Sequence, residues 1–402
     1  YAVSVPLPYG LYLVKETTVP EDHSPVEDFY VKVSEDHPDQ PQVWKVLLDE
    51  EFGAKLKIIK RDKDSGNTIL KPGAEFKIFS LRDNAYVKQM TCYPKKKIHE
   101  SYFTDETGTL ILPENLRPGK YRIEEITPPE GYLPDAGENV VTIDSHVPVK
   151  VDELTGDLLV EAYIENQEVK GRLELLKKGP VLTGFEDGRF LYEVKGLAGA
   201  QFSVEAEEDI FYADGRKLKD GQKEAVLKKG EIAARLTTDE KGKALSEILP
   251  LGHYLVRETK APYGCRLIDE PWSVELKSDK QSAVVTKTLE VQDPKQQVEV
   301  SVVKQTTEEG NRPLQGAEFS LYAEKPVCSR EDATVLVPED GLIGKAVSDE
   351  KGQVHFTDTL PHGEYYIRET AAPKGYDISP LKVECPVLYQ DGRESVIKVG
   401  RT

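Results

Sequence analysis

Cysteine is scarce in this chain, with four residues among 402. The four form no Cys-x-x-Cys pair and lie near no histidine at the spacing of a zinc site, so neither a metal nor a cofactor is expected. Few cysteines in so long a chain also exclude a fold held mainly by disulfides. Cys328 and Cys385 fall in one repeat and could pair with each other, which the sequence alone does not decide.

Long apolar runs and positive charge are also lacking. No hydrophobic stretch reaches membrane-spanning length, and neither a signal peptide nor a sorting signal is present. Lysine and arginine number 53 against 71 aspartates and glutamates, which gives a formal net charge of −18. Contacts to phosphates need clustered lysine and arginine, so nucleic acid is excluded as a partner. We also expect no membrane contact within these residues.

Motifs of conventional catalysis are missing as well. The seven histidines do not cluster with serine, cysteine or aspartate at a repeated position, and neither a phosphate-binding loop nor a His-Glu-x-x-His motif occurs. The chain is therefore not expected to be an enzyme acting on a separate substrate.

The sequence does contain a repeated segment in which Gly-x-Tyr is followed by glutamate and then proline. The copies are YGLYLVKETTVP from Tyr9, PGKYRIEEITPPEGY from Pro118, LGHYLVRETKAPYGC from Leu251 and HGEYYIRETAAPKGY from His362. Three copies are preceded by a strand that ends in lysine, a Gly-Ala-x-Phe segment and an Asp-x-x-Gly turn. Four ordered copies are typical of tandem domains.

The repeats alternate apolar and polar residues and are separated by Gly, Pro and Asp, which predicts short β-strands and turns. We expect an all-β protein of tandem β-sandwiches with about seven strands per unit. The predicted units are 52–168, 169–295 and 296–402, and the last of them is expected to be truncated at its final strand. Residues 1–51 are predicted to be the C-terminal part of a preceding unit, so the sequence is expected to be a piece of a longer protein.

Alternation also places charged side chains on the core-facing side of these strands. The glutamates are Glu16, Glu125, Glu258 and Glu369, each on the face of a tyrosine and an aliphatic residue. Lys60, Lys177 and Lys304 occupy apolar positions of the first strand of each unit, although lysine is rarely buried unless paired. Asn166 and Asp293 lie eleven residues before a repeat lysine, and so does Asp49.

This combination can form a covalent bond. Burial favours the neutral amine of lysine and the neutral acid of glutamate. The amine can then attack the side-chain carbon of Asn or Asp while the glutamate moves the proton. Ammonia or water leaves, and an isopeptide bond remains. The pairs predicted are Lys60–Asn166 with Glu125, and Lys177–Asp293 with Glu258. The alternative is a buried lysine–glutamate ion pair without a covalent bond.

The ordered motifs resemble the Cna protein B-type domain, which also occurs in SpaA-type pilins of Gram-positive bacteria. The resemblance covers essentially the whole chain. It implies prealbumin-like, Ig-like β-sandwiches in a rod-like array, each with a Lys–Asn or Lys–Asp isopeptide bond and a catalytic glutamate. Lys304 with Glu369 lacks its acceptor in this sequence, and Glu16 with Asp49 lacks its lysine. Cys265 replaces a tyrosine of the proline loop, which we expect to change only packing.

The resemblance implies a structural stalk or shaft of a cell-surface adhesin or pilus. Such a protein is extracellular and anchored to the cell wall, with the signal peptide and anchor outside these residues. Its expected partners are neighbouring pilin subunits or host extracellular matrix. The segment CYPKKK from Cys92 resembles a pilin motif whose lysine joins subunits, but a basic solvated loop is the favoured interpretation.

The alternative function is an adhesin module that binds a matrix protein such as collagen. Insertions at 185–197, 209–230 and 325–344 are the candidate binding loops. Spacer hairpins are the favoured interpretation of these insertions.

Overall fold

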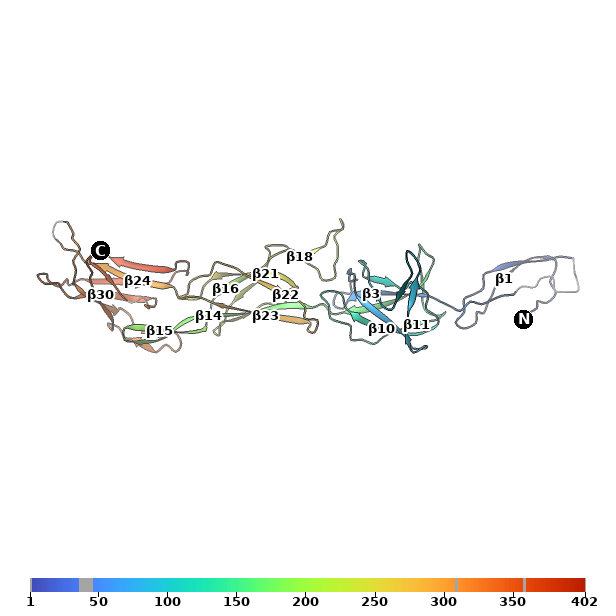
Figure 1. Cartoon of the computed structure of the whole chain (residues 1–402), viewed down its shortest axis with the longest axis horizontal. Helices are drawn as coiled ribbons and strands as arrows, with labels where there is room; N and C mark the ends of the chain where they lie inside the picture. Colours follow the sequence, from blue (N-terminus) through green and yellow to red (C-terminus); the bar gives the residue numbers. More distant parts are fainter. Residues whose placement is uncertain (1, 36–45, 308–309, 357–358, 402) are drawn as a thin grey trace. The chain divides into compact units, whose positions relative to one another are not determined.

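A computed structural model of the chain describes residues 2–35, 46–307, 310–356 and 359–401 (Figure 1). All regular secondary structure within these ranges is β-strand, which confirms the all-β prediction. The strands build three β-sandwiches: the first sandwich from β3–β13, the second from β14–β23 and the third from β24–β32. No helix long and apolar enough to cross a membrane occurs in the described part of the chain.

The chain divides into two compact units. The first unit comprises residues 1–169 with 212–224 and 280–283, and the second comprises 170–211, 225–279 and 284–402. The first unit begins with a hairpin of β1 Gly10–Val14 and β2 Phe29–Val33, which pair antiparallel.

The first sandwich has two sheets, ordered β11-β10-β4-β5 with β8 beside β4, and β12-β13-β3-β9. Its strands are β3 Lys55–Asp62, β4 Glu75–Ser80, β5 Ala85–Tyr86, β6 Gln89–Thr91, β7 Lys97–His99, β8 Tyr102–Phe103, β9 Thr109–Ile111, β10 Gly119–Thr127, β11 Asn139–Ile143, β12 Lys150–Val151 and β13 Leu158–Asn166. Leu56, Ile58 and Lys60 of β3 are all fully buried, as the alternation predicts.

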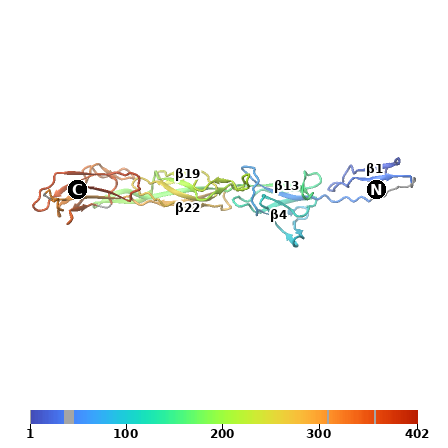
Figure 2. The same cartoon turned by 90° about the horizontal axis from the view of Figure 1, so that it is seen from above.

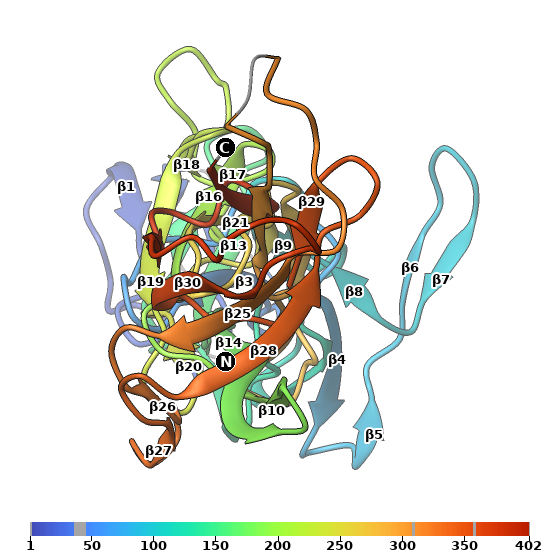
Figure 3. The same ribbon diagram turned by 90° about the vertical axis from the view of Figure 1, so that its left-hand side faces the viewer.

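The segment CYPKKK lies at the tip of the β6–β7 hairpin, which stands away from the sheets of the first sandwich (Figure 3). Tyr93 is 90% exposed there, and Lys95 and Lys96 are exposed as well. The hairpin therefore has the solvated position expected of a basic loop.

The second sandwich pairs the sheet β15-β14-β20, with β23 beside β14, against β19-β16-β21-β22, whose edge strands β19 and β22 are labelled in Figure 2. Its strands are β14 Lys170–Glu186, β15 Arg189–Gly196, β16 Gln201–Ala206, β17 Ile210–Phe211, β18 Ala225–Leu227, β19 Ile232–Thr237, β20 Lys243–Leu245, β21 Gly252–Lys260, β22 Trp272–Leu276 and β23 Val284–Gln292. β14 is 17 residues long, about twice the length of β3, and its second half pairs with β15.

The third sandwich contains the sheets β29-β24-β32 and β28-β25-β30-β31. Its strands are β24 Gln297–Val303, β25 Glu318–Ala323, β26 Val327–Cys328, β27 Val335–Val337, β28 Leu342–Val347, β29 Gln353–His355, β30 Gly363–Ala371, β31 Lys382–Val387 and β32 Val396–Arg401. In all three sandwiches the first strand pairs in parallel with the last, as β3 with β13, β14 with β23, and β24 with β32. This pairing places the start and end of each repeat side by side.

The three insertions contain hairpins. Residues 185–197 belong to β14–β15, residues 209–230 contain β17–β18, and residues 325–344 contain β26–β27. Residues 212–224 pack within the first unit, where the Asp214 carbonyl accepts a hydrogen bond from the Leu70 N–H at 2.7 Å. Hairpins that pack on neighbouring residues favour the interpretation of these insertions as spacers.

None of the four cysteines forms a disulfide in the structure. The disulfide that Cys328 and Cys385 could form is therefore not present. Cys385 is buried in β31 and Cys328 is half-buried in β26.

Candidate cross-linking sites

Lys60, Glu125 and Asn166 meet in the core of the first sandwich. The Lys60 ammonium lies 2.7 Å from Oε1 of Glu125, and the two side chains are 0% and 1% exposed. The Asn166 Nδ2 donates a hydrogen bond to the other carboxylate oxygen, Oε2, also at 2.7 Å. One carboxylate therefore bridges the amine that would attack and the amide nitrogen that would leave.

Strand register brings these groups together. β3 and β13 are parallel with Ile164 opposite Lys60, so Asn166 follows two residues later on the same face. β10 supplies Glu125 from the facing sheet. Asn166 Nδ2 also donates to the Leu133 carbonyl at 2.8 Å, whereas its buried Oδ1 has no hydrogen-bond partner among the described residues.

Burial shifts the Lys60 amine toward its neutral form relative to an exposed lysine. Burial lowers the pKa of Lys60, and the nearby Glu125 carboxylate opposes this effect through charge and hydrogen bonding. Because burial is the largest contribution, Lys60 is a better nucleophile than an exposed lysine.

The second sandwich repeats the arrangement with an aspartate as acceptor. The Lys177 ammonium is 2.6 Å from Glu258 Oε1 and forms a closer contact with Asp293 Oδ1, and all three side chains are 0% exposed. Lys177 and Glu258 are close enough to form an ion pair. Glu258 Oε1 nevertheless has no hydrogen-bond partner within the described part of the chain. Burial raises the pKa of Asp293 to about 7, and the neighbouring Glu258 charge adds to this, while the hydrogen bond and charge of Lys177 oppose it.

The third sandwich and the N-terminal hairpin contain parts of the site. The Lys304 ammonium lies 2.7 Å from Glu369 Oε2. β24 and β32 pair in parallel up to Val302 and Arg401, so the position facing Lys304 falls outside the described residues. Glu16 is half-buried after β1, and Asp49 is exposed in an irregular segment. The isopeptide roles of these four residues stay predictions.

A backbone hydrogen bond that sequence reasoning missed holds every one of the four glutamates. In each case the N–H ten residues later donates to the carboxylate. The donors are Val26 to Glu16 at 2.9 Å, Asp135 to Glu125 at 2.7 Å, Ile268 to Glu258 at 3.1 Å and Ser379 to Glu369 at 2.9 Å. The proline loop therefore folds back onto its strand and orients the glutamate carboxylate. The constant length of this loop was the sequence signal that could have predicted the hydrogen bond.

The Asp-x-x-Gly turn positions the lysines in the same manner. The turn glycine accepts a hydrogen bond from the backbone N–H of the repeat lysine, which the motif alone did not reveal. The pairs are Lys60 with Gly108 at 3.1 Å, Lys177 with Gly242 at 2.7 Å and Lys304 with Gly352 at 2.8 Å. Gly242 has a φ of +76°, and a Cβ there would lie 2.2 Å from the Lys177 carbonyl oxygen.

We therefore expect Gly242→Ala to destabilise the second sandwich by at least about 2 kcal/mol, because it combines an unfavourable φ with a backbone clash. Urea unfolding measures this loss of free energy. Gly230→Ala is the matched control, since Gly230 has a φ of +80° but no described atom within 4 Å of an added Cβ. Equal losses for the two variants would contradict the role of the close approach.

Cys265 lies beside the second site. In the first sandwich the buried Tyr132 hydroxyl donates to Asp62 at 3.0 Å, and Asp62 is two residues after Lys60. Gly179 has that position in the second sandwich, and a Cβ on it would lie 3.5 Å from the Cys265 sulfur. Burial, with the nearby Asp293 charge, raises the pKa of Cys265 to about 12. The thiol thus stays protonated, in agreement with a packing role.

A model of the SpaA prealbumin-like fold domain family matches residues 54–155, 192–290 and 299–399. These matches cover more than half of the chain, so the chain belongs to this family of prealbumin-like domains. The resemblance stated from the sequence motifs is thereby confirmed. The predicted domain limits stay predictions.

A solved structure has a similar fold. The chain resembles the Bacillus anthracis TIE protein at 24% identity and a TM-score of 0.50, over 88% of this chain and 51% of that one. It thus spans about half the length of that protein, and this likeness shows the fold alone. BcpA, the major pilin subunit of Bacillus cereus, gives 18% identity and a TM-score of 0.34, over 87% and 99% of the two chains. Shaft pilin SpaA from Lactobacillus rhamnosus GG gives 17% and 0.22, over 58% and 98%. No curated protein matches this chain.

Proposed function

We propose that this chain is part of the stalk or shaft of a Gram-positive cell-surface adhesin or pilus, stiffened by isopeptide bonds that its own domains form. The observation that carries the proposal is the repeated meeting of a buried lysine, a bridging glutamate and an Asn or Asp in the sandwich core. Membership of the SpaA family of prealbumin-like domains supports the same function. Extracellular location and anchoring to the cell wall belong to this proposal.

The reaction in the first sandwich uses three groups. The Nζ of Lys60 bonds to the side-chain carbon of Asn166, and the carbon–nitrogen bond of the amide breaks. Glu125, as the neutral acid, donates the proton on one oxygen to the amide nitrogen, which leaves as ammonia, and takes a proton from Nζ at its other oxygen. In the second sandwich Glu258 serves Lys177 and Asp293 in the same way, and the leaving group is water. Each domain reacts once, so the chain is not a turnover enzyme.

The bond closes a long loop, because Lys177 and Asp293 lie 116 residues apart in sequence. By the entropy model used for disulfides, a loop of this size adds about 4–5 kcal/mol to the free energy of unfolding. A reducing agent does not break an amide, so this stabilisation does not depend on cysteine. Both properties suit a structural stalk outside the cell.

Intact mass under reducing conditions tests the proposal. We expect the purified chain to be lighter than its sequence by about 35 Da, from one ammonia of about 17 Da and one water of about 18 Da. Changing Glu125 and Glu258 together to Ala should restore the full mass. An unmodified mass in the unchanged chain would show that the sites are buried ion pairs and would refute the covalent proposal.

Partners follow from the same function. We propose neighbouring subunits of the surface assembly as partners, with the exposed β6–β7 hairpin as one accessible surface. Binding to host matrix remains the alternative function. The β14–β15 hairpin packs against the third sandwich, which leaves the insertion at 185–197 less free to grip a ligand.

A further inference from the structure

The strand that carries Lys177 continues without interruption into the third sandwich. Beyond Lys177, β14 pairs with β15 to form a hairpin whose inner side chains are Leu182 and Phe190. These two are 4% and 3% exposed and belong to the hydrophobic core of the third sandwich, together with Val327 and Val337. The second sandwich thus supplies part of the core of its neighbour.

Polar contacts fix the position of this hairpin along the third sandwich. The Phe190 N–H donates to the Thr359 hydroxyl at 3.1 Å, and the Tyr192 hydroxyl donates to the Thr359 carbonyl at 2.9 Å. The Arg330 N–H donates to the Leu182 carbonyl at 2.9 Å. Main-chain and side-chain bonds at several points leave the hairpin a single register.

The acceptor side is fixed to the same sandwich. Asp293 is followed after one proline by Lys295, whose ammonium donates to the Leu360 carbonyl at 2.9 Å. The next residue, Gln296, is 2% exposed, donates to the Glu394 carbonyl at 2.7 Å and lies 2.9 Å from the ring Nε2 of His362. Both reactive residues therefore lead directly into segments that the third sandwich holds.

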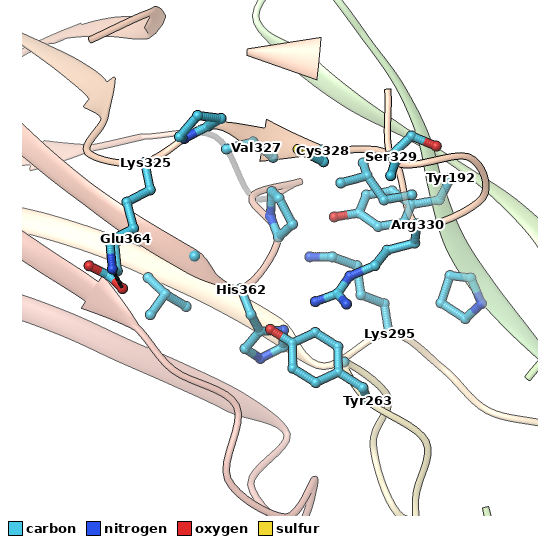
Figure 4. A pocket seen from close by; sticks show the side chains of 18 of the residues that line it. Tyr192, Tyr263, Lys295, Lys325, Val327, Cys328, Ser329, Arg330, His362 and Glu364 are labelled. Atoms are coloured by element: carbon cyan, nitrogen blue, oxygen red, sulfur yellow. Dashed lines mark hydrogen bonds and ion pairs between the residues drawn. The ribbon is translucent and has the colours of Figure 1, made fainter. Parts of the chain in front are cut away.

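Figure 4 shows the pocket at this junction from close by. A pocket of about 500 Å³ is lined by residues of both sandwiches, with Lys295 and Tyr192 from one and Arg330 from the other. The Lys295 ammonium lies 5.2 Å from the centre of the Tyr192 ring, and the Arg330 guanidinium lies 4.1 Å from that of Tyr263. These cation–aromatic contacts add to the junction outside the hydrophobic core.

The first sandwich lacks such an extension within the described residues. β3 ends at Asp62, two residues after Lys60, whereas β14 continues for nine residues after Lys177. Asp62 is held instead by Tyr132, and the second sandwich has Gly179 and Cys265 at these positions. In the first sandwich the Tyr132–Asp62 contact orients β3. In the second sandwich this contact is replaced by docking of the β14–β15 hairpin on the third sandwich.

We propose that the third sandwich is a positioning element for the cross-link of the second. Docking of the β14–β15 hairpin and of residues 295–296 sets the relative register of Lys177 and Asp293, so this bond forms only after the third sandwich has folded. The inference rests on the proposed cross-linking function. Its physical basis is that a small misplacement of reacting groups slows a reaction steeply.

The test follows both bonds in the full chain after cell-free synthesis, by mass analysis of the linked peptides at successive times. Leu182→Asp removes the docked side chain, and Val194→Asp, 55% exposed on β15, is its control. A second pair of variants lies in the third sandwich and leaves the sequence of the second sandwich unchanged. Val337→Asp changes a buried residue, and Val335→Asp, at a position that is 54% exposed, is its control.

We expect both buried variants to slow the Lys177–Asp293 bond by roughly tenfold or more, while the exposed variants match the unchanged chain. The Lys60–Asn166 bond in the same molecules serves as an internal clock and should keep its rate. Unchanged formation of the Lys177–Asp293 bond in Leu182→Asp and Val337→Asp would overturn the inference alone. Absence of both bonds from the unchanged chain would instead refute the proposed function.

Discussion

Glu258→Gln should leave Lys177 and Asp293 unlinked and lower the free energy of unfolding of the second sandwich by about 4–5 kcal/mol. Glutamine keeps the volume of glutamate and can still accept the hydrogen bond of the Ile268 N–H, but it cannot carry the proton from the amine. The buried ion pair between Lys177 and Asp293 remains. The lost free energy of unfolding therefore comes mainly from opening the cross-linked loop, and less from a buried charge left without a partner.

Urea unfolding followed by tryptophan fluorescence measures this loss. Trp272 lies in β22 of the second sandwich beside Phe202, and Trp44→Phe removes the other emitter of the chain. Lys177→Met combined with Asp293→Leu and Glu258→Gln is the matched control, because it also prevents the bond and leaves no buried charge at the site. Similar losses for Glu258→Gln and the control would assign the effect to loop closure. Equal stability of Glu258→Gln and the unchanged chain would contradict a cross-link.

The two cross-links should differ in their dependence on pH. Before linkage the second site holds one amine and two carboxyl groups, and loss of water requires the acid form of Asp293. Its pKa is raised to about 7, so the protonated fraction falls about tenfold between pH 6 and pH 8. The first site, with an amide as acceptor, needs no additional proton. We expect the Lys177–Asp293 bond to form about tenfold faster at pH 6 than at pH 8, with little change for Lys60–Asn166.

Linked peptides sampled over time at the two pH values test this difference in one chain. Asp293→Asn should remove the pH dependence and change the mass loss from about 18 to about 17 Da. The unlinked second sandwich should also lose stability as pH rises from 3.8 to about 7, because its folded state holds the Asp293 proton more tightly than the unfolded chain. A faster reaction at pH 8 would contradict this proton requirement.

The strand pattern predicted much of the candidate site because alternation is a local property. It placed Lys60 and Glu125 on core-facing sides, and the structure brings their charged groups within 2.7 Å. The spacing from Asn166 to the next repeat lysine pointed to Asn166 as the candidate acceptor without any knowledge of the sheet. Repetition supplied the remaining information, since a pattern found once would have been compatible with an exposed strand.

Contacts between distant segments could not be predicted in this way. The strand pattern of β14 does not show that its second half leaves one hydrophobic core and enters another, since both halves alternate alike. The exchange of Tyr132 and Asp62 for Cys265 and Gly179 is visible in sequence, but only the fold shows that the two positions touch. The possible Cys328–Cys385 pairing failed for the same reason, because membership of one repeat does not bring two side chains together.

Parallel pairing of the first and last strands has a mechanical consequence. Parallel neighbours point the same way, so the chain enters each sandwich at one end of the pair and leaves at the other, and a pull on the chain loads this pair in shear. Lys60 and Asn166 lie near the far ends of β3 and β13. In the linked domain, tension would pass along β3, cross the Lys60–Asn166 amide and leave the sandwich. The residues between Lys60 and Asn166 would then carry no force, and the domain could not extend.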